Sequence, residues 1–154
     1  MIWSESTKID TVMRDVSSLG GGFITFFLSV LLYIVGKDAV AFQLLLGFAL
    51  VYPFTLLIRA VHFKARPTPM KYRSFIEKLD ASSFPSIHAA NSFYAAYVLH
   101  SAFTSNPASA FLFFMAALVG YTRIYLKKHY PVDVIGGALT GVLAAYITTT
   151  FIIL

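Results

Sequence analysis

Two histidines and an aspartate are the residues of this chain with the clearest capacity for chemistry. His88 follows Pro85 and Ser86 in the stretch FPSIHAAN, and His129 stands four positions before Asp133 in the stretch HYPVD. A carboxylate bound to one ring nitrogen of an imidazole fixes the tautomer and leaves the other nitrogen free to attack. The spacing lets Asp133 do this for His129, and His88 could then protonate a leaving oxygen as general acid.

Three arginines accompany these residues. Arg59 and Arg66 stand at the end of one apolar run, and Arg123 stands at the end of another. Guanidinium groups match the geometry of phosphate oxygens and stay charged, so three of them can bind a dianionic phosphoryl group. Ser86 adds a hydroxyl, and the N–H groups that follow Pro85 favour an anion if a helix starts there. Phosphoryl transfer depends mainly on positioning and charge neutralisation, which these groups supply without a metal.

Simpler interpretations exist for each residue taken alone. An arginine near a helix end commonly extends to the lipid headgroups, and an interfacial histidine is commonly a hydrogen-bonded bystander, as we interpret His62 and His100. Neither explains three arginines, two histidines and an aspartate at four helix ends on one face. A zinc site is a further alternative. Because three guanidinium groups would repel a cation, we expect no metal and no other cofactor.

The composition determines the class of protein that must position these residues. The chain has 154 residues, of which 58% are hydrophobic and 12% charged, about half the charged fraction of an ordinary soluble domain. Since a soluble core of this size cannot hide so much apolar surface, we predict a single membrane-embedded domain over residues 1–154. The absence of cysteine excludes disulfides and a thiolate nucleophile.

Five apolar runs approach the ~20 residues that span a bilayer as a helix. We therefore predict an all-α, polytopic membrane bundle with about five transmembrane helices. Pro53 should kink the second of these helices without ending it. The runs cover residues 19–36, 39–61, 86–103, 108–126 and 134–154.

The segment 1–18 precedes the first run and has a different pattern. Apolar residues at helical spacing (Ile9, Val12, Met13 and Val16) alternate with charged ones. This favours a short amphipathic helix lying on the membrane surface, with a partly frayed tail as the alternative.

The basic residues indicate how the chain crosses the membrane. The net charge is +5, and all but one of the 12 lysines and arginines fall in or beside the amino terminus and the loops 62–84 and 123–133. Lys37 alone lies on the other side. Clustering between apolar runs is typical of membrane proteins, so we expect no nucleic-acid partner, a cell-membrane location and a cytoplasmic active-site face. Gly137 and Gly141 could mark a dimer face or close packing within the bundle. The oligomeric state is not predicted.

Three motifs in these loops resemble a known family. Arg66-Pro67, the PSIH of residues 85–88 and the TRIYLKKHYPVD of residues 122–133 resemble, in order, the signature motifs of the type 2 phosphatidic acid phosphatase family. These membrane lipid phosphatases share their site with soluble acid phosphatases and vanadium haloperoxidases. The resemblance covers about residues 59–133.

The resemblance implies a role for each residue. His129 resembles the nucleophile that forms a phosphohistidine, Asp133 its orienting partner and His88 the general acid. The resemblance makes Ser86, Arg66 and Arg123 phosphate-binding residues, and it implies a metal-independent reaction.

The chain departs from the family pattern in two residues and in length. Arg59 stands where the first motif usually has lysine, which leaves its phosphate-binding role the least defined, and Thr122 replaces a serine. The chain also resembles the family core without the first helix of the common six-helix members.

The sequence thus predicts a membrane lipid phosphatase acting on a lipid phosphomonoester or diphosphate. Basic loop residues could hold a second phosphate, which favours polyprenyl diphosphate over phosphatidate or phosphatidylglycerol phosphate. The alternative is a non-catalytic lipid-phosphate binding or transport protein, which would not need both histidines and the aspartate. A haem- or ion-handling protein would instead need ligand pairs at mid-membrane depth. The basic residues concerned are Lys64, Lys71, Arg73, Lys127 and Lys128.

Overall fold

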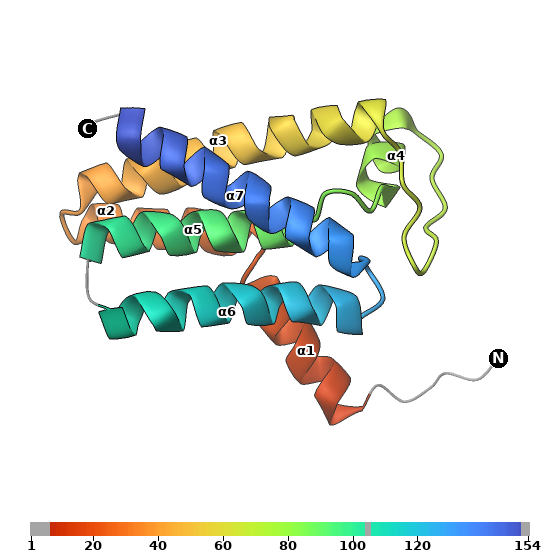
Figure 1. Ribbon diagram of the computed structural model, residues 1–154, viewed down its shortest axis with the longest axis horizontal. Helices are drawn as coiled ribbons and strands as arrows, with labels where there is room; N and C mark the ends of the chain where they lie inside the picture. Colours follow the sequence, from red (N-terminus) through yellow and green to blue (C-terminus); the bar gives the residue numbers. More distant parts are fainter. Residues whose placement is uncertain (1–6, 104–105, 152–154) are drawn as a thin grey trace.

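The chain forms a helical bundle in a computed structural model that describes residues 7–103 and 106–151. The long helices α2, α3, α5, α6 and α7 run along the long axis, and the short helices α1 and α4 lie at one end (Figure 1). Within the described residues there is no β-strand, so the all-α prediction is confirmed. The helices are α1 Lys8–Ser18, α2 Gly22–Ile34, α3 Asp38–Val61, α4 Phe75–Ala81, α5 Ile87–Phe103, α6 Asn106–Tyr125 and α7 Pro131–Phe151.

Each of the five predicted apolar runs overlaps one long helix, and α3, α6 and α7 begin one to three residues before the predicted runs. Three helical segments are long and apolar enough to cross a membrane: α3, residues Pro107–Tyr125 of α6, and α7. A fourth span results if α1 and α2, which are bent by 53° relative to each other, count as one. The membrane-helix character is therefore confirmed, and the number five stays a prediction. The last run extends to residue 154, beyond the described residues.

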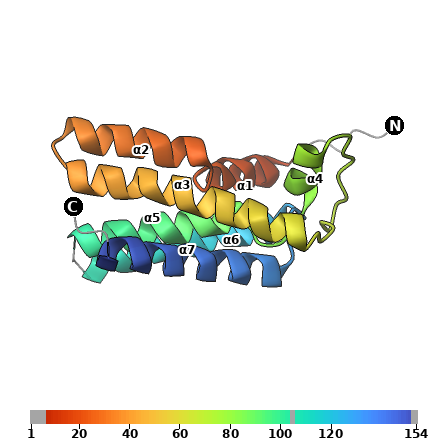
Figure 2. The ribbon, with the colours of Figure 1, turned by 90° about the horizontal axis from the view of Figure 1, so that it is seen from above.

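Helix α5 lies at the centre of the bundle, between α7, α6 and α3 (Figure 2). The glycines of α7 allow its close approach: a Cβ on Gly137 would meet the Ser86 carbonyl and Ala89, and a Cβ on Gly141 would meet the Ala90 carbonyl. Both glycines are buried against α5. Packing within the bundle is therefore the correct interpretation of this pair, and a dimer face is not.

Residues Lys8–Ser18 of the amino-terminal segment form a regular helix, as the apolar spacing predicted, and residues 1–6 lie outside the described residues. Thr7 caps α1 by accepting from the Asp10 N–H at 3.2 Å, and Asp10 accepts from the Thr7 N–H at 3.1 Å. This capping box fixes the first turn. Helix α1 packs on α6, and its last turn buries Ser17. The helix therefore starts away from the bundle and ends next to the predicted site.

Residues 62–84 form a closed loop over the same end of the bundle. An isolated antiparallel bridge joins Ala65 to Ser82, and the Ser83 N–H donates to the Lys64 carbonyl at 2.7 Å. Between them lies α4, a helix that the sequence pattern did not reveal, capped by Ser74. Helix α3, which leads into this loop, continues through Pro53 as predicted.

Candidate active site

His129 lies between the end of α6 and the start of α7, with 2% of its surface exposed. Its Nδ1 is 2.7 Å from the Ser83 carbonyl oxygen. Because a carbonyl only accepts, we assign the proton to Nδ1, which leaves the Nε2 lone pair free. Burial, and then the charges of Arg123 and Arg66, lower the His129 pKa to about 3. The ring is therefore neutral at neutral pH, as a nucleophile must be.

Asp133 is fully buried in the first turn of α7. It accepts from Lys64 Nζ at 2.6 Å, from the Tyr130 N–H at 2.8 Å and from the Ser83 hydroxyl. The expected direct bond from Asp133 to His129 is absent from the described contacts. Since Pro131 begins α7, the carboxylate turns back to cap the helix at Tyr130, and His129 stays outside the turn.

Ser83 contacts Nδ1 of His129, the position that the four-residue spacing predicted for Asp133. Its carbonyl accepts from His129, its hydroxyl donates to Asp133, and the same hydroxyl oxygen lies 3.4 Å from His129 Nδ1. The aspartate therefore acts on the histidine through Ser83. The sequence carried no spacing signal for this residue, because Ser83 reaches His129 across 46 positions of chain.

Lys64 is the partner of Asp133, which corrects its expected use for a second phosphate. The ion pair is 2.6 Å long, and Nζ also lies 4.8 Å from the centre of the Tyr130 ring. Placing an ammonium against a buried carboxylate offsets the cost of burying that charge. Lys64 therefore stabilises the buried carboxylate in the first turn of α7.

Arg59 is almost completely buried, and its side chain joins α4 to the loop before α5. Its Nη1 donates to the Leu79 carbonyl at 3.2 Å and its Nη2 to the Pro85 carbonyl at 2.8 Å. A planar fork can serve two carbonyls in one fixed geometry, which a lysine ammonium cannot do as rigidly. This gives a physical reason for arginine here.

Arg66 and Arg123 are anchored in a similar way by other parts of the chain. Arg66 Nη2 donates to the Asp80 carbonyl and lies 3.9 Å from the Asp80 carboxylate. Arg123 Nη1 donates to the Ser17 hydroxyl at 2.7 Å, which ties α6 to the end of α1. The arginines are therefore fixed by α1, α4 and the loop before α5.

All three arginines keep a buried Nε atom for which the described residues provide no hydrogen-bond partner. They line one cavity of about 290 Å³ together with His88 and His129. Asp80 is the one carboxylate among the residues that line this inner cavity, and it is already paired with Arg66. Buried donors normally have acceptors. The cavity is lined by three guanidinium groups, whose positive charge an anion with several oxygens would balance.

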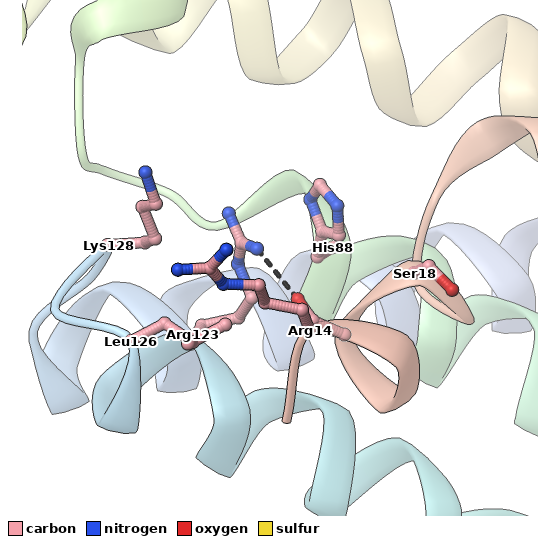
Figure 3. A pocket seen from close by; sticks show the side chains of 7 residues that line it. Arg14, Ser18, His88, Arg123, Leu126 and Lys128 are labelled. Atoms are coloured by element: carbon pink, nitrogen blue, oxygen red, sulfur yellow. Dashed lines mark hydrogen bonds between the residues drawn. The ribbon is translucent and has the colours of Figure 1, made fainter. Parts of the chain in front are cut away.

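His88 and Ser86 occupy different positions at the start of α5. His88 is half-buried and lines both the inner cavity and an adjoining outer cavity of about 620 Å³ (Figure 3). Ser86 is fully buried; its N–H donates to the Asp133 carbonyl at 2.9 Å, and its hydroxyl accepts from the Ala89 N–H at 3.4 Å. Ser86 lines neither cavity, so its phosphate contact stays a prediction.

The structure thus brings five of the seven predicted site residues to one cavity: Arg59, Arg66, His88, Arg123 and His129. Asp133 and Ser86 stand behind them. The arrangement offers a nucleophilic ring nitrogen, a second imidazole that can carry a proton, and fixed positive charge for an anion.

Comparisons with known proteins show the family of this chain. Residues 40–153 match the PAP2 superfamily. A 58-residue stretch is 47% identical to the lipid A 4'-phosphatase of Bacteroides thetaiotaomicron; the stretch covers 38% of this chain and 26% of that relative, so the chain matches about a quarter of the relative's length.

Two solved structures share the fold. One is the crystal structure of Aquifex aeolicus LpxE, with a TM-score of 0.78 and 29% identity over 95% of this chain and 88% of that one. The other is the first transmembrane PAP2 type phosphatidylglycerolphosphate phosphatase from Bacillus subtilis, with a TM-score of 0.63 and 26% identity over 93% and 76% of the two chains. Because the superfamily match extends over well more than half of the sequence, this chain belongs to the PAP2 superfamily.

Proposed function

We propose that this protein is a membrane lipid phosphatase that hydrolyses a lipid phosphate ester through a phosphohistidine. The observation that carries the proposal is the inner cavity, where three buried arginine Nε atoms without partners stand beside two histidines. A phosphoryl group would balance the positive charge of the guanidinium groups that line this cavity. A purely structural cluster would have its donors satisfied within the protein.

The reaction follows from the positions of the two rings. His129 Nε2 attacks phosphorus while the bond between phosphorus and the lipid oxygen breaks, and His88 gives that oxygen a proton. Water then attacks the phosphohistidine, releases inorganic phosphate and restores His129, while His88 takes up the proton of the water. The arginines carry the charge on the transferring oxygens throughout.

An apolar cavity supports a lipid as the molecule that carries the phosphate. It has a volume of about 560 Å³ and lies between α3 and α7, with Val51, Phe54, Ile58 and Leu143 among its lining residues. Ile58 directly precedes Arg59, so the cavity reaches the turn of α3 that carries this arginine. A hydrocarbon tail in this cavity would keep its headgroup at the site.

The relatives support a lipid phosphate but differ in their named substrates. One is named for lipid A and another for phosphatidylglycerolphosphate. Polyprenyl diphosphate, which the basic loops favour, is the third member of the panel that we propose to test, with phosphatidate as a simple monophosphate.

We place the active site on the cytoplasmic face of the membrane. The loops 62–84 and 123–133 and helix α1 share one end of the bundle, and the turn before α3, with Lys37, lies at the other (Figure 2). All lysines and arginines except Lys37 belong to the first end. This asymmetry supports the orientation by the positive-inside rule.

The test is phosphate release from this lipid panel in detergent with a chelator present. We expect the wild type to act on at least one lipid and His129→Ala to lose activity by about a thousandfold or more. His100→Ala is the matched control, because His100 bonds Ser109 at 2.6 Å near the other end of the bundle. It should retain full activity.

Other outcomes would contradict the proposal in distinct ways. Activity that the chelator abolishes, or full activity in His129→Ala, would exclude the phosphohistidine mechanism. Tight binding of a lipid phosphate without turnover of any member of the panel would favour the non-catalytic binding protein.

A further inference from the structure

The outer cavity has a lining that the phosphatase reaction does not require. It joins the last two turns of α1 to the end of α6 and the loop after it, and it shares His88, Arg123 and Lys128 with the inner cavity. Its own residues include Arg14 and Ser18 from α1. The two cavities are therefore neighbouring parts of one site.

The outer cavity is strongly positive. Figure 3 shows the guanidinium groups of Arg14 and Arg123 in the space between Lys128 and His88. None of the residues that line this cavity is a carboxylate. Three cations around one cavity repel one another unless an anion lies between them.

Two acidic residues of α1, Asp10 and Asp15, flank Arg14 in the sequence, and neither lines the cavity. Asp10, one turn before Arg14, accepts from the Tyr125 hydroxyl at 3.1 Å and from the Thr7 N–H at 3.1 Å. It does not line the cavity. Asp10 therefore attaches α1 to α6 and offsets part of the charge of Arg14 from outside the cavity.

The position of Arg14 is fixed by the packing of α1. The bond between Ser17 and Arg123 holds the last turn of α1 at the site, and Ser17 itself is buried. Gly20, directly after the helix, lies so close to the His88 carbonyl and Val119 that a Cβ would meet both at 2.8 Å. Helix α1 is thus built into the wall of the site, with Arg14 at its rim.

We propose that the outer cavity binds a second phosphate of the same lipid headgroup while the inner cavity holds the reacting phosphate. This rests on the proposed function and narrows its substrate class to lipids with two phosphates. Arg123 and Lys128 reach both groups, and Arg14 contacts the second one alone. Lys64, which the loop composition offered for this purpose, is used by Asp133.

The test compares the binding of matched lipids to the His129→Ala variant, where turnover does not interfere. One pair is a polyprenyl monophosphate and the diphosphate of equal chain length. The other is phosphatidate and phosphatidylglycerol phosphate with equal acyl chains. Arg14→Gln should weaken binding of the two-phosphate member of at least one pair about tenfold and leave its partner within twofold.

Lys8→Gln is the matched control, since it removes one positive charge from the same helix, and Lys8 lines neither cavity. It should change neither member of either pair. If it acts like Arg14→Gln, general attraction to an anionic surface explains the effect and the subsite is excluded. Equal losses for both members of each pair, or no loss in any, also overturn the subsite.

Adding inorganic phosphate together with the monophosphate lipids distinguishes binding of a free phosphate ion from binding of a second phosphate attached to the lipid. If phosphate strengthens their binding in an Arg14-dependent way, the cavity takes a free ion and the proposal is wrong. Turnover by the wild type tests the proposed phosphatase activity separately. Arg14-dependent selective binding without turnover would exclude the phosphatase activity and support the subsite. Turnover without Arg14-dependent selectivity would support the phosphatase activity and exclude the subsite.

Discussion

The inner and outer cavities share three residues and differ in how their other groups are held. In the inner cavity, His129 is bonded to a backbone carbonyl, Arg59 to two, and both side chains are buried. In the outer cavity, Arg14 and Ser18 are exposed. The groups of the inner cavity are held in place before any ligand arrives, and the outer cavity presents exposed charge to solvent.

This difference separates two tasks. Fixed donors and a fixed ring can stabilise a transition state without rearranging, so changes in the inner cavity should act mainly on kcat. Exposed cations attract and retain a charged headgroup, so changes in the outer cavity should act on KM and weaken with salt. The following variants test whether changes around the inner cavity act mainly on kcat, in order of decreasing expected effect.

Ser83→Ala should have the largest effect. It removes one of the three donors to the buried Asp133 carboxylate and keeps the carbonyl that holds His129. A hydrogen bond to a charged group is worth about 1.5–3 kcal/mol, so we expect kcat to fall about tenfold to a hundredfold with KM within threefold. Steady-state kinetics on the best lipid of the panel measures both.

The control for Ser83→Ala is Ser101→Ala, which removes an exposed hydroxyl bonded to the Tyr97 carbonyl at the other end of α5. Its kinetics should equal those of the wild type. A rise in KM for Ser83→Ala without a change in kcat would break the contrast, because the inner network would then be binding substrate and not positioning the ring.

Local patterns predicted much of the fold and part of the site. The hydrophobic runs give the long helices because their lengths and apolar content reflect local rules, and Pro131 marks the start of α7 for the same reason. The types and order of the arginines and histidines in the sequence predicted that these residues gather at one site, as they do at the inner cavity. Helix α4, with seven residues in a polar loop, had no apolar period to reveal it.

The contacts of the site could not be read from the sequence because they join distant segments. Ser83 meets His129 across 46 positions, Lys64 meets Asp133 across 69, and Arg123 meets Ser17 across 106. Spacing of four residues suggested that Asp133 would touch His129. Tertiary packing inserted Ser83 between them instead.

Arg59→Lys should have a smaller effect than Ser83→Ala. The lysine would keep the positive charge but lose the two-carbonyl fork that joins Leu79 to Pro85. Because one hydrogen bond to a charged donor is lost, we expect kcat to fall about tenfold. Wild-type kinetics in this variant would show that Arg59 acts only through its charge, and that the loop needs no fork.

The smallest effect concerns the pH dependence of stability. The native His129 pKa of about 3 lies below the value of about 6.5 expected in an unfolded chain. Between these values the unfolded chain binds a proton at His129 and the native protein does not, so stability falls as the pH falls. From about pH 7.5 to about pH 5.5 the loss is about 1 kcal/mol.

Thermal unfolding in detergent across this range measures the effect, with His129→Asn as the comparison. The variant has no imidazole to protonate, so its stability should fall less steeply toward low pH, whatever its stability at pH 7.5. Arg14→Gln is the control from the outer cavity: because arginine stays charged throughout this range, its slope should equal that of the wild type. Equal slopes for His129→Asn and the wild type would mean that the native ring takes up a proton as readily as in solution. The His129 ring would then be open to water, and the contrast between a buried, fixed group and an exposed one would no longer hold.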